Sequence, residues 1–259
     1  MSGADEERET LAEGSLISHL MELRDRLLRA VIAVLICFAP CAFFSDRLFT
    51  LVALPLMEKM PQGTSMIATS IVAPFMAPLK LALLAGLFIA MPYVLYQAWA
   101  FVAPGLYRHE KRFAIPLMLS SIVLFYCGVA FAYFVVFPLM FSFLTSAAPH
   151  GVQVMTDMSN YLDFVLLLFF AFGIAFEIPI ATVLLAATGL VKLETMAKNR
   201  GYVVLGIFVI AAFLTPPDAV SQCFMAIPMY ILYEGGIIMA RVLLKSRLAR
   251  QQQEQSASS

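Results

Sequence analysis

Long apolar runs separated by short polar segments dominate the chain. The runs cover residues about 27–44, 76–98, 113–144, 161–190, 202–214 and 221–240. They do not alternate apolar and polar positions, as the strands of a membrane barrel would. A helix needs roughly 20 residues to cross a hydrocarbon core about 30 Å thick, and its backbone groups bond internally. The pattern therefore predicts an all-α membrane protein with six transmembrane helices.

Two of the runs have unusual lengths. Run 113–144 carries no charged residue and extends ~48 Å as a helix, so it must tilt or project from the bilayer. Run 202–214, which stops at "TPPD", reaches only ~20 Å as a helix. A long helix beside short fifth and sixth helices predicts a lopsided, concave body.

Polar segments flank the apolar runs at both ends of the chain. Residues 1–19 are polar and acidic and show no features of a cleaved signal peptide. Residues 246–259, which include "RQQQEQSASS", are of low complexity and are expected to be disordered. The six-helix transmembrane domain is therefore assigned to residues 20–245.

Composition and charge placement agree with the membrane class. Hydrophobic residues make up 61% of the chain and charged residues 13%, whereas a soluble domain has about a quarter of its residues charged. Most of the 17 Lys and Arg residues lie in the two terminal segments and in the segments 107–112 and 191–200. The positive-inside rule places such segments, and hence both termini, in the cytoplasm.

Metal and hydrolytic chemistry find no support in the sequence. The three histidines lack the spacing of a zinc protease, and no G-x-S-x-G motif occurs. The four cysteines lie inside apolar runs and are interpreted as small buried side chains. We therefore predict no enzymatic activity, no metal and no cofactor.

Acids at the cytoplasmic boundary are the candidate binding groups. Glu22 lies in "SHLMELRDRLLRA", where it can pair with Arg26, and Asp25 with Arg29, at i,i+4 for ~0.2–0.5 kcal/mol each. Glu110 in "YRHEKR" precedes the third helix, whose N-terminus favours an acid. Each acid could instead receive a cation from a partner. Arginine suits that role best, because its planar fork bonds a carboxylate through two N–H groups.

Three further acids lie in or beside the apolar runs. Glu177 in "AFEIPI" costs ~2.5–3.5 kcal/mol to insert, and it is either protonated and bonded to a neighbouring helix or a contact for a partner helix. Glu234 adjoins Gly235 and Gly236, which favour close helix packing. Together Glu177 and Glu234 also allow an alternative function, a proton-coupled secondary transporter. Asp218 in "LTPPDAVSQ" is expected to cap the last helix.

Five motifs occur in order along the chain: "HLMELRDRL", "YQAWAFVAPGLYRHEKR", "AFAYFVVFP", "FGIAFEIP" and "LTPPDAVSQ". Over residues 15–245 the chain thereby resembles the TatC family, the multispanning receptor subunits of twin-arginine protein translocases. The resemblance implies a receptor in the bacterial inner membrane that recognises folded precursor proteins by paired-arginine signal peptides, with transport driven by the proton-motive force. It implies as partners TatA- and TatB-type single-span subunits, further copies of the chain and membrane lipids, but no nucleic acid.

The resemblance also assigns residues to roles. Glu22 and Glu110 match the acids expected to receive the signal arginines, and Arg24 and Phe101 match positions grouped with them. The other matched positions are Glu177 for an intramembrane partner contact, Pro55 and Asp218 on the periplasmic side, and Tyr133. Helix 202–214 is where a single-span partner is expected to pack. Many family members carry an acid shortly before the residue matching Phe75, but "VAPF" lacks it, so no role is assigned there.

Overall fold

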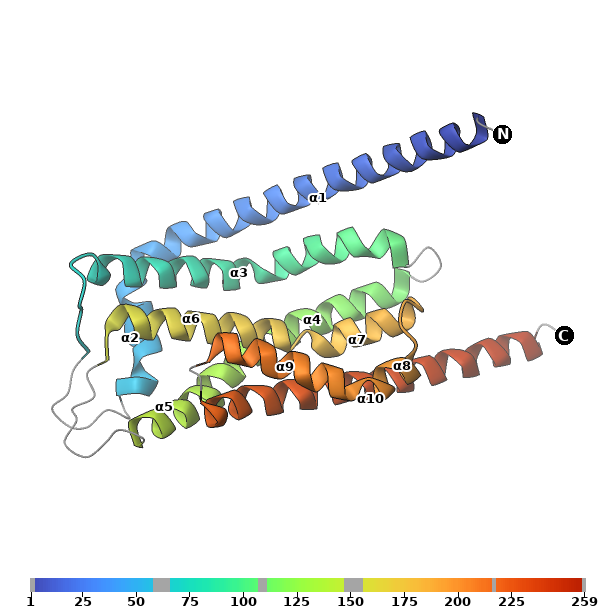
Figure 1. The fold of residues 1–259 in the computed structure, drawn as a ribbon. Coiled ribbons are helices and arrows are strands. Elements are labelled where there is room, and N and C mark those ends of the chain that lie inside the picture. Colours follow the sequence, from blue (N-terminus) through green and yellow to red (C-terminus); the bar gives the residue numbers. More distant parts are fainter. Residues whose placement is uncertain (1–2, 58–65, 107–110, 147–155, 216–217, 258–259) are drawn as a thin grey trace. The chain divides into compact units, whose positions relative to one another are not determined.

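The structure is a computed structural model that describes residues 3–57, 66–106, 111–146, 156–215 and 218–257. Within these ranges every regular element is helical, apart from one isolated bridge between Ile67 and Asp157 (Figure 1). The elements in chain order are α1 (Gly3–Phe43), α2 (Ser45–Met57), α3 (Ala73–Leu106), α4 (Lys111–Phe131), the π-helical turn η1 (Ala132–Val136), α5 (Phe137–Ser146), α6 (Met158–Ala175), α7 (Ile178–Ala187), α8 (Leu193–Lys198), α9 (Arg200–Leu214) and α10 (Ala219–Ala257).

Five helical stretches among the described residues are long and apolar enough to cross a membrane. They are Ile17–Phe43, Ala73–Phe101, Ile115–Phe143, Met158–Ala187 and Ala219–Leu243. Large apolar side chains along them remain exposed, such as Leu27 at 62% and Phe134 at 72%, as expected for surfaces that face lipid. The prediction of an all-α multispanning membrane protein is confirmed.

The two C-terminal helices differ in length. α9 has 15 residues, so the short fifth helix predicted from the sequence is present. The prediction of a short sixth helix is wrong, because α10 has 39 residues and includes an apolar stretch of 25. Pro228 lies inside α10 without ending it. The Lys, Arg, Gln and Ala residues that follow favour helix, and α10 continues to Ala257 through the segment for which the sequence predicts disorder.

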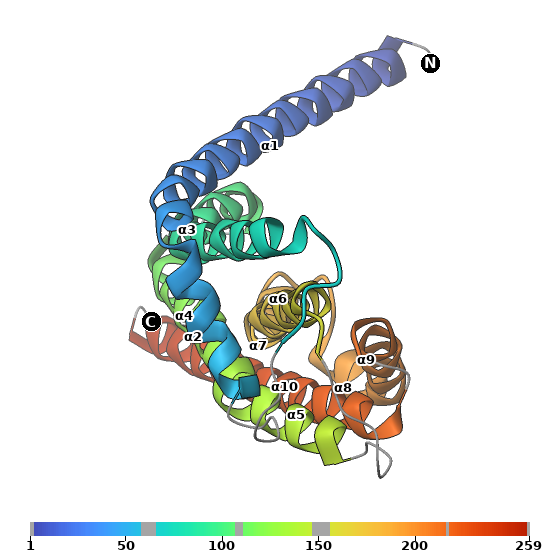
Figure 2. The same ribbon diagram turned by 90° about the vertical axis from the view of Figure 1, so that its left-hand side faces the viewer.

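Two of the predicted long helices are interrupted in the structure. The third contains η1, which ends two residues before Pro138. Proline removes a backbone donor and crowds the preceding turn. The fourth divides into α6 and α7, with Pro179 at the start of α7. Proline at the first turn of a helix needs no N–H partner, so the chain restarts a helix there. Figure 2, which looks along α6, shows α7 nearly in line behind it.

The described helices form two compact units, and the first comprises residues Met1–Phe49 and Pro78–Ile122. It contains α1, most of α3 and the first part of α4. Small residues let α1 and α3 approach closely: a Cβ at Gly86 would lie 2.7 Å from the Cα of Phe38. Ala82 and Ala90 of α3 are buried. Close packing through small residues is the usual way in which helices associate in a membrane.

The second unit comprises residues Thr50–Ala77 and Val123–Ser259. Its interior is rich in aromatic rings, including Phe137, whose centroid lies 5.0 Å from that of Phe169. α10 packs along α7 and also against α8 and α9, as Figures 1 and 2 show. A buried cluster of Met196, Tyr233 and Ile237 joins α8 to α10.

Candidate functional site

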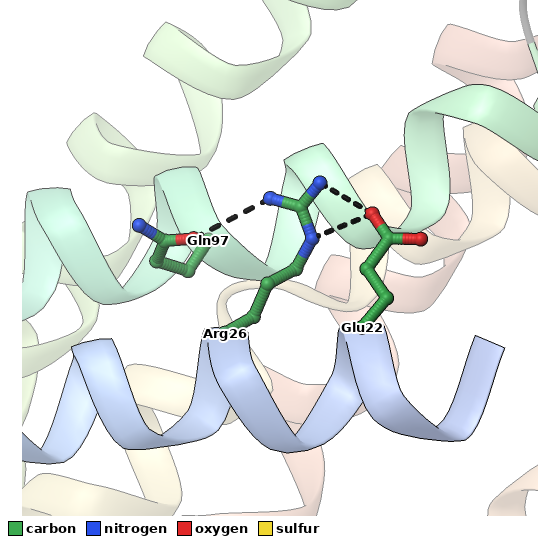
Figure 3. A network of polar contacts seen from close by, with 3 residues as sticks. All are labelled: Glu22, Arg26 and Gln97. Atoms are coloured by element: carbon green, nitrogen blue, oxygen red, sulfur yellow. Dashed lines mark hydrogen bonds and ion pairs between the residues drawn. The ribbon is translucent and has the colours of Figure 1, made fainter. Parts of the chain in front are cut away.

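Glu22 and Arg26 lie one turn apart on α1 and form the ion pair that their spacing predicts. Arg26 donates to Glu22 Oε1 twice, from Nε at 2.9 Å and from Nη2 at 2.5 Å. Its third nitrogen, Nη1, donates to the side-chain oxygen of Gln97 on α3 at 3.4 Å (Figure 3). The Arg26 side chain is 22% exposed and that of Glu22 39% exposed. Both N–H groups thus bond one oxygen, while Oε2 of Glu22 points away from Arg26 (Figure 3).

An apolar cavity of about 230 Å³ lies beside this pair, between α1 and α3. Its lining residues are Leu23, Arg26, Leu27, Ala30, Val94, Gln97, Ala98 and Phe101. Phe101 also stacks on His19 of α1, with ring centroids 4.2 Å apart and the planes inclined by 20°. The first unit therefore places Phe101 in the same cavity wall as Arg26, the partner of Glu22.

The other residues predicted around Glu22 behave differently. Arg24 bonds the adjacent Asp25, from Nη2 at 2.8 Å, and both side chains are largely exposed. Asp25 therefore bonds Arg24, where the i,i+4 spacing predicts Arg29. An exposed pair of this kind adds little stability, so Arg24 is open to other anionic groups. Glu110 lies outside the described residues, and its position relative to Glu22 stays a prediction.

The backbone carbonyl of Leu51 links Pro55 and Tyr133, two positions that the resemblance had indicated independently of each other. Residue 55 of α2 would normally donate its N–H to the carbonyl of Leu51, four residues earlier, but proline has none. The Tyr133 hydroxyl, from η1, donates to that carbonyl at 2.9 Å. Tyr161 of α6 donates in the same way to the carbonyl of Val52 at 2.8 Å. The two tyrosines therefore tie α2 to η1 and α6.

Asp157 fastens the start of α6 to the segment that precedes α3. Its Oδ1 accepts from the backbone N–H groups of Ser159 and Asn160, each at 3.0 Å, and so caps α6. Its Oδ2 accepts from the Thr69 hydroxyl at 2.6 Å and from the Thr69 N–H at 3.0 Å. The Thr69 hydroxyl, followed by the backbone donors, lowers the pKa of Asp157 to about 2. A carboxylate that accepts several hydrogen bonds resists protonation.

Glu177 and Asp218 each precede a helix. Glu177 occupies the break between α6 and α7, directly before the residue that begins α7, so its partly buried side chain lies at the positive end of that helix. Asp218 accepts from the backbone N–H of Ser221 at 2.7 Å, which confirms the predicted cap of α10. The apolar run continues through Glu177, so the sequence was interpreted as one helix there, although Pro179 follows two residues later.

Glu234 is held in a closed ion pair that the sequence did not indicate. Arg200 at the start of α9 reaches both of its oxygens, from Nε to Oε1 at 2.6 Å and from Nη2 to Oε2 at 2.8 Å. Tyr230 donates to Oε1 at 2.9 Å. The neighbouring Gly236 packs as predicted, since a Cβ there would lie 2.8 Å from the Cα of Pro179. Gly235 has no such contact within 4 Å.

Sequence reasoning missed Gln97, Thr69 and Arg200, whose roles depend on contacts between residues 71, 88 and 34 positions apart. The Tyr133–Leu51 contact had a usable signal, a proline placed within a helix. Among the described residues, no group of three His, Cys, Asp or Glu side chains is arranged to hold a metal ion.

Five long apolar helices and several shorter ones, among the residues that the structure describes, define the class. The chain is a polytopic α-helical membrane protein. The family model described as "Sec-independent protein translocase protein (TatC)" matches residues 18–228.

Named relatives agree with this match. A TatC protein of Azotobacter chroococcum is 55% identical over 222 residues, covering 86% of this chain and 87% of the relative. One of Escherichia coli K12 is 51% identical over 226 residues, covering 87% and 88%. A crystal structure described as the twin-arginine translocase receptor TatC superposes with a TM-score of 0.78 at 40% identity, covering 86% of this chain and 98% of that one. The chain belongs to the TatC family of twin-arginine translocase subunits, and is a translocase component rather than an enzyme.

Proposed function

We propose that this chain is the receptor subunit of a twin-arginine export system, and that Glu22 and Glu110 receive the paired arginines of signal peptides. The observation that carries the proposal is the accessibility of the Glu22 carboxylate. It is 39% exposed, and Oε2 accepts no bond from any residue that the structure describes. The related crystal structure bears the description "Twin Arginine Translocase Receptor", which is why a guanidinium pair is the ligand proposed.

The position of Glu22 suits an arginine that arrives with an apolar segment. The first apolar stretch begins at Ile17, so Glu22 lies near the boundary between polar and apolar surroundings. Partial desolvation at that depth makes a charge-assisted hydrogen bond stronger than it would be in water. Arg24 and Phe101 border the site: Arg24 attracts anionic groups, and Phe101 lines the apolar cavity beside Glu22.

We infer a topology with both termini in the cytoplasm of a bacterium, and a chain that crosses the inner membrane six times. The cationic segments support this orientation, and α9 supplies the sixth, short crossing. TatA- and TatB-type subunits and further copies of the chain are the proposed assembly partners, with the proton-motive force driving transport. α9 offers a surface for a single-span helix, since Tyr202, Leu205 and Phe213 are exposed. Glu177 is proposed as a polar contact for such a helix.

Charge reversal tests the receptor proposal. In the variant Glu22→Lys, photocrosslinking to a synthetic paired-arginine signal peptide is expected to fall at least tenfold, because an attraction becomes a repulsion. Glu194→Lys is the matched control: Glu194 is an exposed acid of α8, outside the site. Equal crosslinking in wild type and Glu22→Lys would remove Glu22 from the docking site.

The transporter alternative receives no support from the contacts of Glu234. Both of its oxygens are engaged by Arg200, so a proton relay through this residue would first have to break a two-point ion pair. Glu22 differs in that one oxygen remains accessible, which is the property a docking group needs.

A further inference from the structure

We propose that Arg26 is a built-in competitor for Glu22, which an arriving guanidinium must displace before it can bind the carboxylate through both oxygens. The inference rests on the proposed function of Glu22 and deepens it, because it concerns how tightly that site binds a cationic peptide. Arg26 is the same chemical group as the proposed ligand, and it already lies on Oε1.

Two arginine–carboxylate pairs within the chain show the difference between a closed and an open arrangement. Arg200 engages both oxygens of Glu234, one nitrogen to each. Arg26 sends both of its bonds to one oxygen of Glu22, and the other oxygen points away from it (Figure 3). The strong two-point geometry of a guanidinium on a carboxylate needs both oxygens. An incoming arginine therefore reaches that geometry only if Arg26 leaves Oε1.

The pair is also weak enough to be displaced. Glu22 and Arg26 are one helical turn apart and both are partly exposed. Pairs of this kind in exposed helices shift an equilibrium by only about twofold, rising somewhat with burial. An incoming arginine that binds through both oxygens replaces the bonds that Arg26 gives up.

Released Arg26 keeps a partner and a place for its stem. Nη1 already donates to Gln97, whose side chain is 5% exposed. The aliphatic part of Arg26 lines the apolar cavity together with Leu23 and Leu27. Arginine often packs its stem on apolar surface while its charged end bonds elsewhere. Displaced Arg26 therefore keeps one hydrogen bond, and its side chain, which is 22% exposed, remains in contact with solvent.

The consequence is a threshold for binding. Every arriving cation competes with the positive charge of Arg26 for Glu22, so Arg26 lowers the affinity of every cationic peptide by about the same factor. At a given peptide concentration, peptides with paired arginines still occupy the site, whereas the more weakly bound lysine peptides no longer do.

Binding measurements on the full-length chain in lipid nanodiscs test this proposal. The dissociation constants of two fluorescent signal peptides, one with paired arginines and one with paired lysines, are measured for wild type, Arg26→Gln, Arg26→Lys and Glu22→Gln. Arg29→Gln serves as the charge control, because Arg29 is an exposed cation on the same helix outside the pair. Size-exclusion profiles verify that each variant is intact.

We expect Arg26→Gln to bind both peptides about two- to tenfold more tightly, by the same factor for each. Arg26→Lys, which keeps the charge but loses the fork, should lie between wild type and Arg26→Gln, and Arg29→Gln should show a smaller gain. Weaker binding by Arg26→Gln would mean that Arg26 orients Glu22, and unchanged binding would mean that it is not displaced; either result overturns the inference. If Glu22→Gln binds the paired-arginine peptide as tightly as wild type does, Glu22 is not a docking residue and the proposed function of Glu22 is wrong.

Discussion

At the scale of single residues, a missing backbone donor explains why two separated positions act together. Pro55 leaves the Leu51 carbonyl without its helical N–H, and the Tyr133 hydroxyl supplies a donor instead. The π-helical turn η1 contains Tyr133, and such single turns often occur at functional sites. The Tyr133 hydrogen bond is needed because Pro55 lacks an N–H, so substitutions at Tyr133 and Pro55 should have non-additive effects on the free energy of unfolding.

A double-mutant cycle measures that coupling. Tyr133→Phe should lower the free energy of unfolding by about 0.5–1.5 kcal/mol, because one hydrogen bond is lost. In a Pro55→Ala background the loss should shrink, since the new N–H can serve the Leu51 carbonyl. Chemical unfolding in detergent micelles gives both values.

Tyr161→Phe is the matched control for this cycle. Tyr161 donates to the carbonyl of Val52, whose helical donor is the N–H of residue 56, a leucine. The loss caused by Tyr161→Phe should therefore be the same in the wild-type and Pro55→Ala backgrounds. Equal losses for Tyr133→Phe in both backgrounds would contradict the coupling.

Asp157 makes stability depend on pH. Its pKa is lowered from 3.8 to about 2, first by the Thr69 hydroxyl and then by the backbone N–H of Asn160. The unfolded chain therefore binds this proton more readily, so the contribution is complete above about pH 4 and is lost as the pH falls through about 2.

We expect the thermal unfolding midpoint of the wild type to fall across that window. Asp157→Asn keeps a side-chain cap for α6 but cannot titrate, so it should start lower and lose less between pH 4 and pH 2. Parallel pH profiles for the two proteins would show that Asp157 does not fasten α6 to Thr69.

At the scale of elements, the packing of α10 on α7 depends on one of two adjacent glycines. A Cβ at Gly236 would lie 2.8 Å from the Cα of Pro179 and 3.0 Å from Cβ of Thr182, whereas one at Gly235 meets nothing within 4 Å. Pro179 follows Glu177 by two residues, so this contact also holds the start of α7 and the acid at the helix break.

Two alanine substitutions separate the glycines. Gly236→Ala should destabilise the protein by about 1–3 kcal/mol, because the backbone of α7 must shift to admit the methyl group. Gly235→Ala should be neutral or stabilising by up to about 1 kcal/mol, since alanine favours helix. Unfolding in a denaturant series compares them, and equal effects would argue against this contact between α7 and α10.

At the scale of the whole molecule, the proposed role concerns export of folded proteins and can be tested in cells. Deletion of the chain should leave proteins with paired-arginine signals inside the cytoplasm, measured by cell fractionation. Wild type should restore export, and Glu22→Lys should not, because the first contact with the signal is lost. Restoration by Glu22→Lys would separate the docking residue from the family assignment.

The sequence by itself determined the class, the approximate spans and the family. Apolar runs long enough to cross a bilayer leave few alternatives to helices, because lipid offers no partners for backbone groups. Local patterns also sufficed for the Asp218 cap and the Glu22–Arg26 pair, since both depend on residues within four positions of each other.

Only the tertiary structure decided the contacts between distant residues. The break at Glu177 and the turn at Tyr133 lie within continuous apolar runs, where a nearby proline permits an interruption but does not require one, and the long α10 lies in helix-favouring sequence. Gln97 on Arg26, Tyr133 on the Leu51 carbonyl and Arg200 on Glu234 join residues far apart along the chain. Such pairs depend on how the helices pack, and packing follows from the fit of whole surfaces rather than from a local pattern.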